Sequence, residues 1–207
     1  MLDGHLLLLF LAAATLLAVT PGPGIFYVLA RTLAGGKREG VLSAFGTFIG
    51  GSIHVLAAGL GLSAVLAASA TAFAMVKYAG ALYLVWLGFR MIRTRNVAMD
   101  DTAETGKRNH AFRQGVVTEA LNPKTALFFL SFLPQFVSVA LGHVVVQFLL
   151  LGIVSVSLNT IADLLVVSFA APIGARLRSS ARFRRNQRVA SGVGMMGLGA
   201  FVAFGEK

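Results

Sequence analysis

Two apolar stretches of this chain are each interrupted by proline, and these interruptions limit the possible folds more than any other feature. The first interruption is Thr20-Pro21-Gly22-Pro23-Gly24, inside an apolar stretch from residue 6 to about residue 33. The second is Asn122-Pro123-Lys124, inside a stretch from residue 112 to about residue 136. Proline lacks an N–H and clashes with an earlier carbonyl, which costs about 3 kcal/mol in a helix interior. Neither stretch is therefore expected to form one continuous helix.

The composition of the chain indicates an integral membrane protein. Of its residues 57% are hydrophobic and 13% are charged, whereas a soluble domain carries about 25% charged residues. The formal net charge of +10 does not indicate nucleic-acid binding, because the basic residues lie in short loops between apolar spans, the pattern that sets membrane orientation. The sequence contains no cysteine, which excludes disulfides and thiolate metal sites.

Six apolar spans are expected, each near the length of about 20 residues that a helix needs to cross hydrocarbon. They are residues 6–33, 41–68, 72–92, 112–136, 144–173 and 189–204. The first is expected to be retained rather than cleaved as a signal peptide, because no Lys or Arg precedes it. The polar loop 93–111 divides the chain into a first repeat, 1–92, and a second repeat, 112–207. The predicted fold is a single all-α transporter domain in the membrane.

The distribution of basic residues predicts the orientation of the spans. Of the 18 Lys and Arg residues, all but Lys77, Lys124 and Lys207 fall in alternate loops, and such loops are expected in the cytoplasm. Because each half has three spans, the halves run antiparallel, as an inverted repeat with helices 1 and 4 broken at the proline motifs. The arginine run from Arg176 to Arg188 is expected to touch anionic lipid headgroups.

Each proline motif is expected to start a half-helix near the middle of the membrane, because Asn122 is a good N-cap and Pro123 suits the first helical position. Free N–H groups there would favour a carboxylate, and carbonyls freed at Leu17, Val19 and Glu119 would favour an ammonium group. A small zwitterion fits both. The expected substrate-binding residues are Thr20, Pro21, Gly22, Pro23, Gly24, Glu119, Asn122, Pro123 and Lys124. The alternative is that the prolines only kink two helices for packing.

Ionisable residues within the expected spans are candidates for function, because a charge there costs at least about 2.5 kcal/mol and normally faces the protein interior. They are His54, Lys77, Glu119, Lys124 and Asp163. Asp163 shares a helical face with Asn159, so it is the best candidate for a coupling proton, and Glu119 is the rival. A structural ion pair is the alternative for both carboxylates. Lys77 lies near the end of its span, and His54 lies on a helical face made mostly of Gly and Ala. Both are expected to have supporting or packing roles.

Four stretches, in order, resemble the LysE/RhtB family of amino-acid exporters. They are Thr20 to Pro23, Lys77 to Gly88, Leu121 to Phe136 and Arg188 to Gly197. The similarity covers essentially the whole chain, and it implies a bacterial inner-membrane protein that exports amino acids or their derivatives in exchange for protons. One departure is Glu119, where the family's pattern favours an amide such as Asn. A carboxylate there could add a proton site or shift selectivity toward a cationic substrate.

The leading interpretation is a secondary exporter of small zwitterions that uses no cofactor. Export against a gradient needs an energy source, and the sequence contains no Walker A phosphate loop, so an ion gradient is expected. One alternative is a divalent-cation transporter of the same architecture, although only Glu119 and Asp163 lie deep in the membrane. An intramembrane enzyme is disfavoured, because His54 has no paired catalytic motif. The sequence leaves open which amino acid is exported and whether the chain forms a homo-oligomer.

Overall fold

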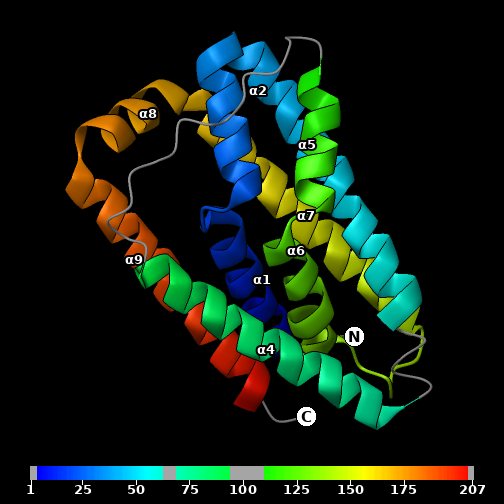
Figure 1. The fold of residues 1–207 in the computed structure, drawn as a ribbon. Coiled ribbons are helices and arrows are strands. Elements are labelled where there is room, and N and C mark those ends of the chain that lie inside the picture. The colour runs from blue at the N-terminus through cyan, green and yellow to red at the C-terminus, as the bar shows by residue number, and fades with distance from the viewer. Residues whose placement is uncertain (1–3, 63–68, 94–109, 205–207) are drawn as a thin grey trace.

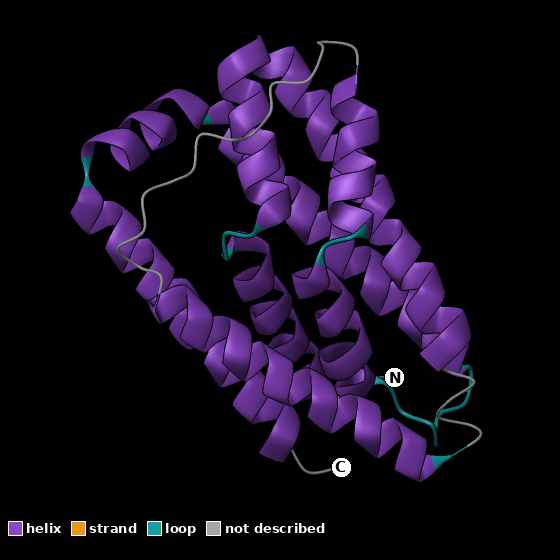
Figure 2. Ribbon diagram, viewed as in Figure 1, coloured by secondary structure: helices purple, strands orange, loops and turns teal. Residues whose placement is uncertain are grey.

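The computed structural model describes residues 4–62, 69–93 and 110–204. Within these ranges every regular element is a helix (Figure 2), so the prediction of an all-α chain is confirmed. The longer helices are α1 (Gly4–Val19), α2 (Pro23–Ala57), α4 (Ala70–Arg93), α5 (Ala111–Ala120), α7 (Val144–Ser168), α8 (Ala170–Ser179) and α9 (Ala181–Phe204). The shorter helices are η1 (Ala58–Leu62), α6 (Pro123–Leu127), η3 (Phe128–Phe132) and η4 (Leu133–Phe136). Most of the expected loop 93–111 lies outside the described residues.

Both proline motifs coincide with helix ends. Helix α1 ends at Val19, and α2 begins at Pro23. Helix α5 ends at Ala120, and α6 begins at Pro123. Both connections lie about halfway along the bundle (Figure 2), and α1 and α5 reach that level from opposite ends of the molecule (Figure 1). The backbone groups that these helix ends leave without intrahelical partners therefore come to the same region of the interior.

Helix α2 reverses direction at Gly36, where φ is 81°, a left-handed value that glycine adopts readily because it has no β-carbon. The two arms of α2 are therefore joined by a tight turn. An ion pair crosses this turn, with Arg31 Nη1 3.5 Å from Glu39 Oε2 and both side chains largely buried. The Tyr27 hydroxyl donates to the Ala111 carbonyl oxygen at 2.6 Å, which holds the first arm of α2 against the start of α5.

The second arm of α2 packs directly on α5 through glycine. A β-carbon added to Gly115 would lie 2.7 Å from the Ser43 carbonyl oxygen and 3.2 Å from Gly46 Cα. A β-carbon added to Gly50 would lie 2.8 Å from Glu119 Cβ. Small residues allow this close backbone approach between apolar helices. The approach also brings α2 within reach of the second break.

Helices α4 and α9 form a second closely packed pair, which runs along one side of the molecule (Figure 1). A β-carbon added to Gly199 would lie 2.7 Å from the Ala81 carbonyl oxygen, and one added to Gly192 would lie 2.6 Å from that of Gly88. Aromatic rings link α9 to the segment after the second break, because the ring centroids of Phe132 and Phe201 are 5.6 Å apart.

The C-terminal part departs from the expected span limits. The expected fifth span continued to residue 173, but α7 ends at Ser168 and α8 follows after one residue. The expected sixth span began at residue 189, but α9 begins at Ala181, so described residues of the arginine run lie on helices. By length and composition alone, two helical segments of the described chain are long and apolar enough to cross a membrane: Val144–Ser168, and Pro23–Gly61, which contains the turn at Gly36.

Candidate functional site

The first break exposes backbone carbonyls, and a lysine from the second break binds them. Pro21 has no N–H, so the Leu17 carbonyl four residues earlier loses its usual helical donor and keeps a bond from the Thr20 N–H at 3.2 Å. Lys124 Nζ donates to the Leu17 carbonyl oxygen at 3.1 Å and to the Thr20 carbonyl oxygen at 2.8 Å. Only 5% of Lys124 is exposed. The buried ammonium group is thus held by the backbone of the other broken segment.

The second break is organised by its own side chains. Asn122 caps the helix that follows, because its Oδ1 accepts from the Lys124 backbone N–H at 3.1 Å. Asn122 Nδ2 donates to Glu119 Oε2 at 2.9 Å, and the Thr125 hydroxyl donates to Glu119 Oε1 at 2.6 Å. Both carboxylate oxygens of Glu119 therefore have a donor, and the residue is 2% exposed. This network fixes the carboxylate within one turn of the break.

The glycines of the first break pack against the second break, which His54 also contacts. A β-carbon on Gly22 would lie 3.3 Å from Lys124 Nζ, and one on Gly24 would lie 3.5 Å from Glu119 Cδ. The glycines of the first motif therefore lie directly against the charged side chains of the second. His54 Nε2 lies 3.0 Å from the Glu119 carbonyl oxygen, and its ring stacks on Phe129 with centroids 6.2 Å apart. The histidine is thus a neighbour of the second break.

Asp163 on α7 extends this polar group toward α2. Its Oδ2 atom lies 2.7 Å from the Thr47 hydroxyl oxygen, and its Oδ1 atom is buried without a hydrogen-bond partner. The residue is fully buried. Glu119 and Lys124 are both within electrostatic range of Asp163. We refer to Glu119, Lys124 and Asp163 as the charged triad.

The charged triad has unequal numbers of positive and negative groups. With all members ionised, it holds one cation and two anions. A buried unbalanced charge is costly in an apolar interior, and a bound proton or a cationic ligand removes the imbalance. The net negative charge of the ionised triad therefore favours a proton or a cationic group in this region.

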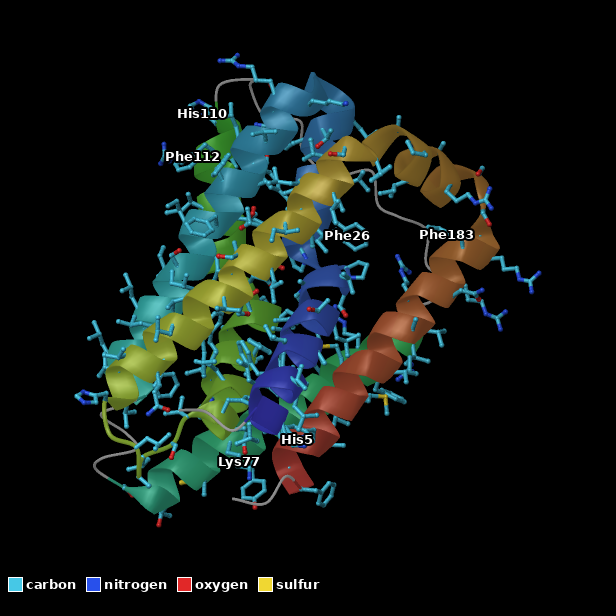
Figure 3. The ribbon with its side chains drawn as sticks, turned by 180° about the vertical axis from the view of Figure 1, so that it is seen from behind. His5, Phe26, Lys77, His110, Phe112 and Phe183 are labelled. Carbon is cyan, nitrogen blue, oxygen red and sulfur yellow. The ribbon has the colours of Figure 1, made fainter. Side chains whose placement is uncertain are left out.

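The structure brings together most of the residues that the sequence singled out. Lys77 lies elsewhere, toward the same end of the molecule as His5 (Figure 3), with its Nζ 5.7 Å from the centroid of the Tyr78 ring. Asn159 is half-buried on α7 and forms no hydrogen bond to the charged triad. Thr47 and Thr125 were not expected in the site. A hydroxyl residue in an apolar helix is a weak signal, because most such groups bond only to their own helix.

No group of three or more His, Cys, Asp or Glu side chains in the described residues is placed to hold a metal ion.

The chain belongs to the LysE type translocator family, whose profile matches residues 15–206. The resemblance noted in the sequence is therefore confirmed, and so is the prediction that the protein is a transporter and not an enzyme. The family is membrane-embedded, in agreement with the composition of the chain.

Relatives cover most of the chain. A Vibrio cholerae protein described as an uncharacterized membrane protein is 31% identical over 203 residues, 98% of this chain and 98% of the relative. A homoserine/homoserine lactone efflux protein of Salmonella typhimurium is 30% identical over 169 residues, 81% of this chain and 80% of the relative. A leucine efflux protein of Enterobacter is 33% identical over 147 residues, 69% of each chain. No solved structure matches the chain.

Proposed function

We propose that this protein exports amino acids or small amino-acid derivatives across the bacterial inner membrane, in exchange for protons. The observation that carries the proposal is the buried charged triad, which lies where two interrupted helices meet. Interrupted helices at corresponding places in two halves of a transporter are a typical location of a substrate site. The names of two relatives, a homoserine/homoserine lactone efflux protein and a leucine efflux protein, support the substrate class.

In this proposal the chain crosses the membrane six times, as two inverted repeats of three spans. The first span comprises α1 and the first arm of α2, and the fourth comprises α5, α6 and η3. The opposite directions of α1 and α5 (Figure 1) support this assignment. Cysteine labelling tests it, because the native chain has no cysteine. Cysteines at positions 107 and 182 should react only from the cytoplasm, and those at 69 and 142 only from outside.

The substrate carboxylate is assigned to the positive side of the site. The Gly24 N–H is near the start of α2, where the helix dipole favours an anion, and the Lys124 ammonium lies against the adjacent Gly22. The substrate ammonium is assigned to Glu119, whose carboxylate is fixed by Asn122 and Thr125. This pairing suits a zwitterion. Glu119 would also favour substrates with a net positive charge.

The coupling proton is assigned to Asp163. Its Oδ1 atom has no hydrogen-bond partner, and Lys124 and Glu119 lie within electrostatic range, so a change in the charge of Asp163 would be felt at the substrate site. An alternative assignment gives the proton to Glu119. A divalent cation in place of the amino acid is the alternative substrate, and it would use the same two carboxylates.

Transport by the purified protein in lipid vesicles tests these assignments. With wild-type protein, labelled amino acid should accumulate in vesicles when a pH gradient is imposed, and a labelled divalent cation should not. Asp163→Asn should abolish accumulation but preserve exchange of labelled for unlabelled amino acid. Glu119→Gln should weaken both. Accumulation by Asp163→Asn would transfer the coupling role to Glu119 or to another ion, and cation exchange without amino-acid exchange would refute the proposed substrate class.

A further inference from the structure

The hydroxyl group of Thr47 has two acceptors but one proton. Its oxygen lies 2.7 Å from Asp163 Oδ2 and 2.8 Å from the Ala44 carbonyl oxygen. A carbonyl oxygen can only accept, and an ionised carboxylate can only accept. A single O–H group cannot donate fully to both at once, so the bond that Thr47 makes depends on the charge of Asp163.

Other buried hydroxyl groups of the described chain do not share this arrangement. Thr32, Ser43 and Thr160 each donate to the carbonyl oxygen four residues earlier in their own helix, a common local bond. Thr47 instead reaches the carbonyl three residues earlier and also contacts a carboxyl group on another helix. It is 1% exposed, so water cannot replace either partner. Its position between α2 and α7 therefore needs a further explanation.

We propose that Thr47 is a switching hydroxyl that responds to the protonation of Asp163. When Asp163 is ionised, Thr47 donates to Oδ2 and leaves the Ala44 carbonyl. When Asp163 carries a proton on Oδ2, that proton is donated to Thr47, and the Thr47 proton turns to the Ala44 carbonyl. Thr47 keeps its own proton throughout, and only the Asp163 proton enters or leaves. This inference rests on the proposed proton coupling through Asp163.

The switch links the charge of Asp163 to the helix that contacts the second break. Three groups face Asp163 from neighbouring elements: Thr47 on α2, Glu119 on α5 and Lys124 on α6. Thr47 is hydrogen-bonded directly to Asp163. The same arm of α2 carries His54, which contacts the Glu119 carbonyl oxygen. Rotation of the Thr47 hydroxyl therefore makes or breaks a side-chain bond to the Ala44 carbonyl, on the helix that supports the substrate site.

Substitutions at Thr47 separate this role from simple packing. Thr47→Val keeps the shape and removes the hydroxyl, Thr47→Ser keeps the hydroxyl, and Thr32→Val is a matched control with one local bond. A hydrogen bond to a charged group is stronger than one to a neutral group, so Thr47→Val loses more when Asp163 is ionised. In vesicles, the pH midpoint of export should move toward higher pH by about one unit in Thr47→Val. It should remain unchanged in Thr47→Ser and Thr32→Val.

Infrared difference spectroscopy gives a second readout that packing alone would not change. The carbonyl-stretch band of a protonated carboxyl group should be absent in Asp163→Asn, shifted in Thr47→Val and unshifted in Thr47→Ser. An unmoved midpoint and band in Thr47→Val, together with loss of coupling in Asp163→Asn, would overturn the switch and leave the proposed function intact. A midpoint that moves to lower pH would also overturn it. Normal coupling in Asp163→Asn would overturn both the switch and the proposed proton site.

Discussion

The two breaks have similar proline motifs but opposite chemistry. At the first break the residue before the new helix is Gly22, which has no side-chain cap, and the carbonyls of Leu17 and Thr20 are bonded by a distant lysine. At the second break Asn122 caps its own helix and also donates to Glu119. The first break thus contributes backbone acceptors, and the second contributes charged side chains.

This difference indicates that the breaks form one unit rather than two independent kinks. At the first break the Leu17 carbonyl has one local donor, the Thr20 N–H at 3.2 Å, and Lys124 supplies the further bonds to Leu17 and Thr20, so the geometry of this break depends in part on Lys124. The second break would retain its cap and its Glu119 network without the first. Removing the bonds from Lys124 to the Leu17 and Thr20 carbonyls should therefore disturb the first break far more than the second. The predictions below test this asymmetry.

The largest effect is expected from Lys124→Met. It removes the Lys124 donor from the buried Thr20 carbonyl oxygen, at about 1–3 kcal/mol for an unsatisfied group, and leaves the Leu17 carbonyl with only its bond from the Thr20 N–H. It also leaves two carboxylates without the triad's cation. Export should be lost, and the thermal unfolding temperature in detergent should fall. Lys77→Met is the control, because Lys77 lies away from the breaks (Figure 3), and it should transport normally. Normal transport by Lys124→Met would mean that the breaks work independently.

A second large effect is expected when the prolines of the first break are removed. Pro21→Ala with Pro23→Ala restores an N–H that can bond to the Leu17 carbonyl, in competition with Lys124. The chain should then favour a continuous helix, and transport should be lost while protein remains in the membrane. Pro172→Ala on α8 is the control. Wild-type transport by the double variant would show that these prolines serve only packing.

A smaller effect is expected from Glu119→Gln. The amide keeps the size of the side chain but removes its negative charge. Its oxygen can still accept from Asn122, and the Thr125 hydroxyl must then accept from the amide N–H instead of donating. The KM for amino-acid exchange should rise about tenfold, equivalent to about 1.4 kcal/mol, and maximal exchange should change little. A larger loss for amines than for amino acids would also support contact with the substrate ammonium. An unchanged KM would assign Glu119 to structure alone.

The smallest effect is expected from Asn122→Ala. Loss of an N-cap costs about 1 kcal/mol, and Glu119 Oε2 also loses its donor. The carboxylate keeps its charge and its bond from Thr125, and Lys124 still bonds to the first break, so the effect should be smaller than in Glu119→Gln. Exchange should continue, with a small fall in the unfolding temperature. Loss of all transport in Asn122→Ala would indicate that Asn122 contacts the substrate.

The sequence predicted helix ends at the two proline motifs and deep positions for Glu119, Lys124 and Asp163, which the structure places in its interior. The limits of the last two spans differ from those expected, and Lys77 is only half-buried. Proline acts through its own covalent structure, so Pro21, Pro23 and Pro123 mark helix ends without knowledge of the fold. The bond from Lys124 to the Leu17 carbonyl could not be predicted, because it joins residues far apart in the chain. The predicted ammonium site at Leu17 is occupied in this structure by the protein's own ammonium group, and sequence periodicity contains no information about such pairing.

Thr47 shows a second limit of prediction from the sequence. Thr47 directly follows Gly46, which packs against α5. A threonine at this position could bond to its own helix or to another helix, and the sequence does not distinguish the two. The expected spans 6–33 and 41–68 placed a connection around Gly36, but the sequence did not show that helix would continue on both sides of this one glycine. Only the relative placement of α2 and α7 identifies the partner of Asp163.

The most direct test of the joined breaks is a comparison of an amino acid with its decarboxylated amine in vesicle exchange. Wild-type protein should exchange the amino acid, and the amine should compete at least tenfold more weakly, because it lacks the carboxylate assigned to Lys124 and the start of α2. Lys77→Met should preserve this preference. If the amine competes as well as the amino acid in wild-type protein, the carboxylate site between the two breaks does not exist and the central claim is wrong.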